Sequence, residues 1–573
     1  MPLRHRQHRV ALVPLDSRPC NARLPRLLGT MVDYEVLIPP EESLGSFTRP
    51  GNCEEIAAWL RGVAGEVDCV VVSIDMLAFG GLEPSCTTQC SLDASISHLH
   101  ILRELRREHR DLAVFCFNAI TRSSIPTWAD RSGHDVQRIR RYGELQDRVR
   151  RLGEKDLREE MLDLEKEIPG DLLSDYLSTR ERNHQVNRHA VEMAADGSID
   201  FLVLGQDEAS EFGPHRNEQD ALESLAEKKG VADAVVVCSG IDEMGMCLLA
   251  RFINTHMLRT PSVAVIYSSD DAPDRVAPLE DRTLRETVRQ HIVVTGCEEA
   301  IGPADADLVM FVNAPADGDR EAVTEDETTY LQRCSDLEEF VESIASQTAS
   351  ERPTVVADAA FPDGADPVLI ALLLERVSVH RLASYAGWRT PANAVGSALA
   401  QGCTRLVALQ DRGAFNLAHS LGQLNTLRYL SLLDSLIDSE KTHIEFLFAR
   451  LVEDWAYQTR VRQMATEHIT RRICTSALDL ARSRAEAEDF VRMHLTQAAH
   501  ELYLNHFLGR RSAQIGSGDE PAHLMLCELE ELHVRLPWGR LREVDLGCRF
   551  GVQLVADRGA TSPAELAGEE AVS

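Results

Sequence analysis

The sequence predicts an α/β protein built on parallel β-sheets with right-handed βα crossovers. Short runs of β-branched and apolar residues recur along the chain, and most of each run is continuously apolar rather than alternating. Strands that are buried on both faces of a parallel sheet have this composition. Segments with helical spacing separate the runs, which favours βα units. Because the chain has more than eight strand candidates, we expect two or three Rossmann-like units, with a distorted (β/α) barrel as the alternative.

Nine runs carry the strand prediction, and five segments between them carry the clearest helical spacing. The predicted strands are 9–15, 34–38, 68–74, 112–118, 200–205, 233–238, 262–267, 307–312 and 354–359. The predicted helices are 53–63, 95–110, 216–229, 241–256 and 334–347.

Two stretches depart from the alternation of predicted strands and helices and suggest how the chain divides into domains. A charged helical pattern indicates an insertion at 133–198, after a first α/β unit at 9–132. A second α/β region follows at 199–410, divisible near residue 300 into two units. We expect a helical C-terminal layer at 411–510 and a short β-like closing segment at 511–556. The small, acidic residues of 557–573 predict a disordered tail.

Composition narrows the classes of partner. The 573 residues carry a formal net charge of −31, which repels phosphate backbones and anionic lipid. No apolar run approaches the ~20 residues that span a bilayer. We therefore expect a cytoplasmic protein that acts on a small molecule, with no nucleic-acid or membrane partner; its oligomeric state stays open. The 14 cysteines include no Cys-x-x-Cys pair, so paired metal-ligand spacing is missing.

Two apolar runs end in adjacent carboxylates. "FLVLGQ" runs into Asp207 and Glu208, and "VVVCSGI" runs into Asp242 and Glu243. Ligands of parallel α/β proteins bind where the carboxyl ends of the strands meet loops. Asp242 could instead cap the next helix, whereas Asp207 lies about eight residues before a helical pattern, too far for a cap. We predict that these four acids are the catalytic residues.

Other strand ends add polar or aromatic residues to the same expected edge. They are predicted to bind substrate, although Asp16 and Arg18 could form a local ion pair, Gly80-Gly81 a turn, and Trp388 either core packing or a flat platform for a sugar ring. The set is Asp16, Arg18, Asp75, Gly80, Gly81, Asn118, Arg122, His215, Asp366, Tyr385 and Trp388.

Three hypotheses of function follow from this edge. The sequence has no phosphate-binding loop, dinucleotide fingerprint, H-E-x-x-H or G-x-S-x-G motif. The first hypothesis is a cofactor-free hydrolase of a glycosidic or other polyhydroxylated small substrate, using the acids as general acid and base or nucleophile. The second places a divalent metal among Asp207, Glu208, His215 and Asp242. The third is a non-catalytic sugar- or metabolite-binding protein.

An ordered series of short motifs resembles a known family. The motifs are "VPLDSRPCN", "SIDMLAFGGL", "RERNHQVN", "LGQDEASEFGPHRNE", "GIDEMGMCLLAR", "ADAAFPDGAD", "YAGWRTPANAVG" and "LPWGRLREVD". Over residues 9–546 the chain resembles the bacterial and archaeal family catalogued as domain of unknown function 4127. The resemblance implies no activity or cofactor of its own, but it groups Asn21, Arg182, Asn183, Asn187 and Asn393 with the residues above; Asn21 and Asn393 join the predicted binding set. Ser17, Cys86, Asp363 and Arg389 depart from the family pattern, and the charge of Arg389 bears on substrate identity.

Overall fold

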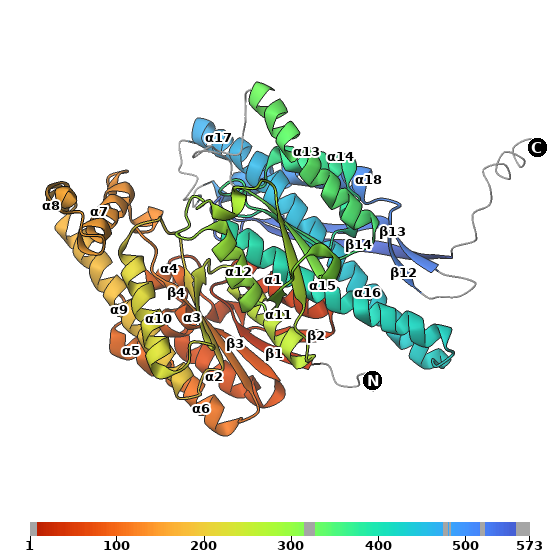
Figure 1. The fold of residues 1–573 in the computed structure, drawn as a ribbon, viewed down its shortest axis with the longest axis horizontal. Coiled ribbons are helices and arrows are strands. Elements are labelled where there is room, and N and C mark those ends of the chain that lie inside the picture. The colour runs from red at the N-terminus through yellow and green to blue at the C-terminus, as the bar shows by residue number, and fades with distance from the viewer. Residues whose placement is uncertain (1–7, 315–326, 474–479, 481–482, 516–521, 557–573) are drawn as a thin grey trace, which may run out of the picture.

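The fold contains two open parallel sheets and a small antiparallel sheet (Figure 1). It was analysed as a computed structural model that describes residues 8–314, 327–473, 480, 483–515 and 522–556. The two parallel sheets confirm the predicted α/β class. Within the described residues neither parallel sheet closes into a barrel, so the multi-unit form of the prediction holds.

The first sheet has six parallel strands in the order β2-β1-β3-β4-β5-β6. Its strands are β1 (His8–Val13), β2 (Tyr34–Leu37), β3 (Cys69–Ser73), β4 (Ala113–Ile120), β5 (Phe201–Gln206) and β6 (Val235–Ser239). The helices between and after them are α1 (Pro19–Met31), α2 (Cys53–Val63), α3 (Ile74–Phe79), α4 (Leu82–Ser85), α5 (Leu92–His98), α6 (His100–Glu108), α10 (Pro214–Lys229) and α11 (Met244–His256).

The second sheet has five parallel strands in the order β11-β10-β9-β7-β8. Its strands are β7 (Ser262–Tyr267), β8 (Glu298–Glu299), β9 (Leu308–Asn313), β10 (Thr354–Asp358) and β11 (Ser384–Ala386). Its helices are α12 (Leu284–Val294), α13 (Glu327–Ala349), α14 (Pro367–Arg376) and α15 (Pro391–Ser420). All nine predicted strands are present, each with ends within two residues of the prediction.

Both parallel sheets follow the same winding rule. In each, the first strand lies between the second and the third, so the chain builds outward in one direction and then in the other. The loops therefore diverge between β1 and β3 in the first sheet and between β7 and β9 in the second, at the carboxyl ends of these strands. Open α/β sheets bind ligands at such a switch point. One large apolar core joins the sheets through α1, α11 and α15, which places the two lobes around a shared helical layer.

Helices flank this pair of sheets. Three of them, α7 (Asp135–Arg150), α8 (Arg158–Glu167) and α9 (Gly170–Ala195), pack around a small apolar core of their own beside the first sheet (Figure 1). A long helix α16 (Thr426–Arg450) continues as a π-helical segment (Leu451–Val461) into α17 (Arg462–Ile473), and α18 (Arg484–His506) follows. An antiparallel sheet of β12 (Arg511–Ile515), β13 (Ala522–Arg535) and β14 (Asp545–Ala556) packs against α16 and α18.

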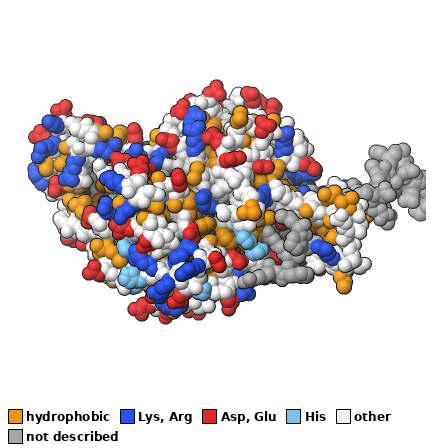
Figure 2. All heavy atoms as spheres, turned by 60° about the horizontal axis from the view of Figure 1, so that its bottom comes forward, with side chains coloured by type: hydrophobic (Ala, Val, Ile, Leu, Met, Phe, Trp, Pro, Cys, Tyr) orange, Lys and Arg blue, Asp and Glu red, His pale blue; other side chains and the backbone are white. Residues whose placement is uncertain are grey.

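The surface mixes charge types. Acidic and basic side chains alternate with apolar ones over the face drawn in Figure 2. Among the described ranges, no helix is both long and apolar enough to cross a membrane.

Candidate active site

The end of β1 supplies a buried acid, a buried arginine and an amide. Asp16 accepts hydrogen bonds from the Arg18 guanidinium, at 2.7 Å from Nη2, and from Asn21 Nδ2 at 3.0 Å. Arg18 has extended backbone angles directly before Pro19, the first residue of α1. Both partners are at most 5% exposed. The local ion pair considered from the sequence is therefore present, but Arg18 also reaches beyond it.

The end of β6 supplies that second partner. Arg18 binds Asp242 through both terminal nitrogens, with Nη1 at 3.2 Å from Oδ2. Asp242 does not cap α11: the residue at the cap position is Glu243, whose side chain makes no cap bond. The carboxylate of Asp242 therefore takes no part in capping the helix. Its Oδ2 also lies 3.8 Å from Arg389 Nη1.

The neighbouring acid Glu243 faces a different environment. Its Oε1 lies 2.9 Å from His291 Nε2, and its Oε2 accepts from Asn393 Nδ2. Burial opposes protonation of His291, but the bond to Glu243 outweighs it, so the pKa of His291 is raised. All three residues are at most 4% exposed. Glu243 and Asn393 therefore do not belong to the charged group around Asp242. Their bonds, with that of His291, connect α11, α12 and α15 instead.

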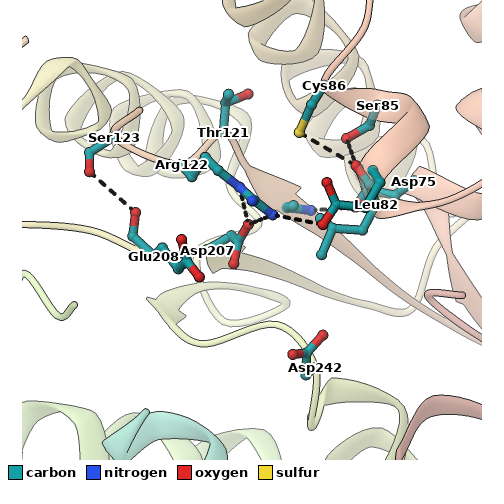
Figure 3. Close-up of polar contacts among 12 residues, drawn as sticks. Asp75, Leu82, Ser85, Cys86, Thr121, Arg122, Ser123, Asp207, Glu208 and Asp242 are labelled. Atoms are coloured by element: carbon teal, nitrogen blue, oxygen red, sulfur yellow. Dashed lines mark hydrogen bonds and ion pairs between the residues drawn. The ribbon is translucent and has the colours of Figure 1, made fainter. Parts of the chain in front are cut away.

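The end of β5 supplies Asp207 and Glu208, which contact different arginines. Asp207 Oδ2 lies 2.8 Å from Arg122 Nε and 2.6 Å from its Nη2, and Figure 3 shows Arg122 pointing at this carboxylate. Glu208 binds Arg389, from the loop after β11, and lies 3.4 Å from Arg542 Nη2. Because Arg389 binds Glu208 and lies 3.8 Å from Asp242, carboxylates from the ends of β5 and β6 belong to one cluster that spans both sheets.

Burial raises the pKa values of these acids, whereas the nearby arginines lower them. Burial raises the pKa of Asp207, which its contact with Arg122 only partly offsets. Burial also opposes ionisation of Asp242, but Arg18 and Arg389 outweigh it and lower the pKa of that carboxyl. The same balance, with Arg389 and Arg122 prevailing over burial, holds the pKa of Glu208 well below its ordinary value. The cluster therefore offers one acid whose pKa is raised and two whose pKa values are lowered.

The end of β3 places Asp75 beneath the cluster. Its Oδ2 accepts from the Ala119 N–H at 2.7 Å, and burial raises the pKa of Asp75 to about 7. Gly80, with φ +84°, ends α3, and a side chain there would meet the Gly51 backbone nitrogen at 2.6 Å. Gly81 follows with φ +127°. These glycines therefore form the tight turn considered from the sequence and bring the loop after it toward the cluster.

Polar residues of α9 hold this loop and the end of β4. Arg182 donates to three carbonyls of the loop, including Ser85 O at 2.6 Å. Asn183 links Ser85 O to Thr121 Oγ1, at 3.0 and 3.2 Å. Asn118 Nδ2 donates to Asn187 Oδ1 at 2.6 Å. These residues position Arg122 and its neighbours rather than contacting the acids.

The remaining predicted residues lie in packed surroundings. Asp366 caps α14 by accepting from the Val368 N–H at 2.9 Å, and Tyr385 lies within β11 rather than on a loop, with its hydroxyl 3.2 Å from Asp358 Oδ2. Trp388 is 7% exposed and packs in the main core, so its ring is no open platform. His215 is fully buried, 3.6 Å from Asp281 Oδ2, and burial lowers its pKa to about 3.

Several contributors were missed from the sequence. Glu83 accepts from Trp128 Nε1 at 2.7 Å and lies 3.8 Å from Arg122 Nη2. Trp538, in the loop between β13 and β14, stacks 5.3 Å from the Arg18 guanidinium and donates to Ser17 Oγ at 3.0 Å. Glu83 follows the Gly-Gly turn and Trp538 lies in the motif "LPWGRLREVD", so both were visible as motif neighbours, but no spacing linked them to the acids.

A cavity of about 350 Å³ opens beside Arg122. Its wall includes Trp128, Cys86 and Thr121, and α9 supplies Tyr176 and Thr179. Figure 3 shows Cys86 and Thr121 on one side of the Arg122 side chain, with Asp207 on the other. A partly exposed indole ring with several hydroxyl groups around it suits a polyhydroxylated ring better than a purely apolar ligand.

The metal alternative has no matching geometry. Among the residues that the structure describes, no group of three or more His, Cys, Asp or Glu is placed to hold a metal ion. His215 contacts Asp281, while Asp207, Glu208 and Asp242 each contact an arginine. The four residues of that hypothesis therefore do not form a ligand set.

Fold and site together define a two-sheet α/β protein with a buried carboxylate–arginine cluster at the carboxyl ends of its strands. The chain belongs to the family described as protein of unknown function (DUF4127), whose model matches residues 10–547. This confirms the family resemblance of the motifs.

Other comparisons add little. No curated protein sequence matches this chain. Among solved structures, the carboxyl transferase domain from Rhizobium etli pyruvate carboxylase aligns at 8% identity over 97% of this chain and 89% of that one, with a TM-score of 0.16. A tyrosine-to-alanine variant of that domain with pyruvate gives 8% identity over the same shares, with a TM-score of 0.17. Scores this low carry no argument about fold or function.

Proposed function

We propose that this protein is a hydrolase that cleaves a glycosidic bond, or a related bond in a polyhydroxylated small molecule, by acid–base chemistry between Asp207 and Asp242. The observation that carries the proposal is the opposite shift of the two acids. Burial raises the pKa of Asp207, whereas two arginines overcome burial to lower that of Asp242. Pairs of carboxyl groups with separated pKa values divide the roles of acid and base in glycoside hydrolysis.

In this proposal Asp207 donates a proton to the leaving-group oxygen. Arg122 fixes its carboxyl group through Nε and Nη2, so one oxygen, Oδ2, is held and the other is left for the substrate. Asp242, held ionised by Arg18, acts as the nucleophile or as the base that activates water. Its position beside Arg18 and Arg389 keeps negative charge available where positive charge develops in the transition state.

The substrate ring is proposed to occupy the cavity that Trp128 lines. Glu83 accepts a hydrogen bond from that indole and forms a longer ion pair with Arg122, at 3.8 Å, which connects the cavity to the acid cluster. A second indole, that of Trp538, stacks on Arg18 within the same cluster. Tryptophan faces commonly bind sugar rings, and the hydroxyl groups of the cavity wall can exchange hydrogen bonds with a polyol.

The experiment is a panel of 4-nitrophenyl glycosides, including acidic sugars because four arginines approach the cluster. Purified wild-type protein is compared with Asp207→Asn and Asp242→Asn, and with Asp545→Asn as a control on β14. We expect about 10²–10⁴-fold loss of kcat for Asp242→Asn, a smaller loss for Asp207→Asn because 4-nitrophenolate needs little protonation to leave, and unchanged kcat for the control. If both site variants turn over every accepted substrate at the wild-type rate, the assigned roles are wrong.

A second function is supported by the distribution of the arginines. Arg18 and Arg122 come from the first sheet, Arg389 from the second, and Arg542 from the closing segment, and all approach the same acids. Two lobes that meet around one charged cluster are also typical of binding proteins that close on a ligand. In that case the same panel would raise the thermal unfolding midpoint without any release of nitrophenol.

A further inference from the structure

The π-helical segment Leu451–Val461 carries a buried charged group. Glu453 and Asp454 lie in it, and Arg450 is the last residue of α16 directly before it. Arg450 binds both carboxylates, with Nη1 at 3.0 Å from Asp454 Oδ1. Asp454 is completely buried, and the other two residues are at most 4% exposed. A buried ion pair adds little net stability over apolar packing, so the position of these charges needs an explanation of its own.

Asp454 holds the loops at the carboxyl ends of two neighbouring strands. Its second oxygen, Oδ2, accepts from the Gly387 N–H at 2.8 Å, in the loop after β11. Its backbone carbonyl accepts from the Ala365 N–H at 2.9 Å, in the loop after β10. Thr459, in the same segment, donates from Oγ1 to Ala365 O at 3.2 Å. The π-helical segment is therefore bonded to both loops, and π-helical turns are frequent at functional sites.

The two loops are also fixed to each other. The Asp363 N–H donates to Arg389 O at 3.0 Å. A side chain at Gly387 would come within 3.1 Å of Asp358 Cβ and 3.4 Å of Ala365 Cα, so the backbones of the loops pack closely at this point. Movement of either loop would therefore be transmitted to the other.

Both loops contain a residue in the left-handed region, Asp363 with φ +66° and Arg389 with φ +68°. Such conformations persist where the surrounding contacts over-determine them. On its C-terminal side Arg389 is followed by Thr390, the N-cap residue of α15. On its N-terminal side the bond from Gly387 to Asp454 restrains the backbone. Arg389 is therefore held between a helix cap and Asp454.

We propose that Asp454 is a positioning residue of the candidate active site, which acts by fixing the loop that carries Arg389. Its effect on turnover rests on the proposed function, whereas its effect on the loop does not. Arg389 binds Glu208 and lies 3.8 Å from Asp242, so its place determines how strongly both carboxyl groups are held ionised. Asp454 acts on this contact at one remove, through the Gly387 N–H.

Two variants of Asp454 and one control test the effect on the loop. Asp454→Leu removes both side-chain bonds and leaves Arg450 paired with Glu453, so the buried group stays balanced in charge. Asp454→Asn keeps one acceptor oxygen for two donors, Gly387 and Arg450, and is the milder change. Glu453→Gln alters the same group at similar burial but keeps Asp454 and its bond to Gly387. Hydrogen–deuterium exchange of the full-length protein is followed at pH 8, because burial raises the pKa of Asp454 to about 7.

We expect the peptide that contains Gly387 to exchange about tenfold or more faster in Asp454→Leu than in the wild type. Asp454→Asn should lie between the two, and Glu453→Gln should match the wild type. Unchanged exchange in Asp454→Leu would overturn the proposal, as would equal acceleration in Glu453→Gln, which would indicate general loosening of the buried group. If Asp454→Leu fails to fold, wild-type exchange in Asp454→Asn overturns the proposal instead.

A double-variant cycle with Arg389→Asn tests whether Asp454 acts through Arg389. In kcat/KM for an accepted glycoside, Asp454→Leu should lose about tenfold. The double variant should stay within about twofold of Arg389→Asn alone, because the residue that Asp454 positions is already absent. Losses that multiply would overturn the proposal. If the wild type turns over no glycoside, the proposed function fails, while the exchange experiment still decides the role of Asp454.

Discussion

Arg389 is the residue on which the joining of the two lobes depends most directly. Its guanidinium binds Glu208 and approaches Asp242, both of which come from the first sheet, while its own backbone belongs to the loop after β11. It is 6% exposed, and its φ of +68° is in the left-handed region that residues other than glycine and asparagine rarely adopt. The structure therefore maintains an unfavourable backbone conformation in order to place this charge.

Replacing Arg389 by Asn removes the ion pairs and also relieves the backbone strain, and the two effects have opposite signs. Removing one partner of a buried ion pair costs about 3–5 kcal/mol, and we expect about 2–3 kcal/mol here because Glu208 retains Arg542 and Asp242 retains Arg18. Asparagine tolerates the left-handed region and returns about 1 kcal/mol. The free energy of unfolding should therefore fall by about 1–2 kcal/mol at pH 7.

A matched control isolates the backbone contribution. Leu258 has a φ of +54° and is 93% exposed, so Leu258→Asn relieves the same conformation without losing an ion pair. It should raise stability by about 0.5–1 kcal/mol. Urea unfolding followed by circular dichroism gives both values. Equal stabilisation in the two variants would show that Arg389 does not hold the acids.

The loss of stability in Arg389→Asn should depend on pH, because the pKa values of two carboxyl groups are lowered in the folded protein. The arginines outweigh burial and lower the folded pKa values of Glu208 and Asp242. Stabilisation from the pairs is therefore fully present above the unfolded carboxyl values of about 4 and is lost as the pH falls through the folded values. The deficit of the variant should shrink below about pH 4. A deficit that grows on acidification would contradict this account.

Three further predictions concern residues around the cluster. Because burial raises the pKa of Asp75 to about 7, folded protein holds a proton that the unfolded chain releases, so stability declines between about pH 4 and 7. Asp75→Asn should flatten that decline in thermal unfolding, and an unchanged slope would refute the assignment. Gly240→Ala would place a methyl group 2.0 Å from Glu243 Oε1 at φ +87°, so the free energy of unfolding should fall by about 2 kcal/mol or more. In Gly230→Ala the added methyl group meets nothing within 4 Å, and the fall should be about 1 kcal/mol. Similar unfolding midpoints for the two variants would count against the packing around Gly240. Trp128→Ala should raise KM for an accepted glycoside about tenfold or more with little change in kcat, and an unaltered KM would remove the cavity from the substrate path.

The positions of the strands were predictable because burial on both faces of a sheet leaves a strong pattern in the sequence. Strands that lack that pattern were missed. β8 has two residues, and β11 has three before Gly387. β13 lies inside the predicted β-like closing segment at 511–556 but was not predicted as a separate strand. It contains "CELEEL", in which Glu and Leu favour a helix, and only its cross-strand partners on β12 and β14 make it a strand.

The candidate site was predictable only in part, for a similar reason. The rule that ligands meet the carboxyl ends of strands found Asp16, Arg18, Asp207 and Asp242, which do lie in one cluster. It could not separate Glu243 from Asp242, because which side of a turn each neighbour faces depends on tertiary packing. Nor could it pair Glu208 with Arg542, 334 residues away.

The test closest to the central claim is the dependence of Asp207→Asn on the leaving group. A general acid matters when the leaving group is poor and is dispensable when it is good. With phenyl glycosides the variant should lose about 10²–10⁴-fold in kcat/KM, while with 2,4-dinitrophenyl glycosides of the same sugar it should stay within about tenfold of the wild type. An equal loss for both leaving groups would contradict the role of Asp207 as the proton donor.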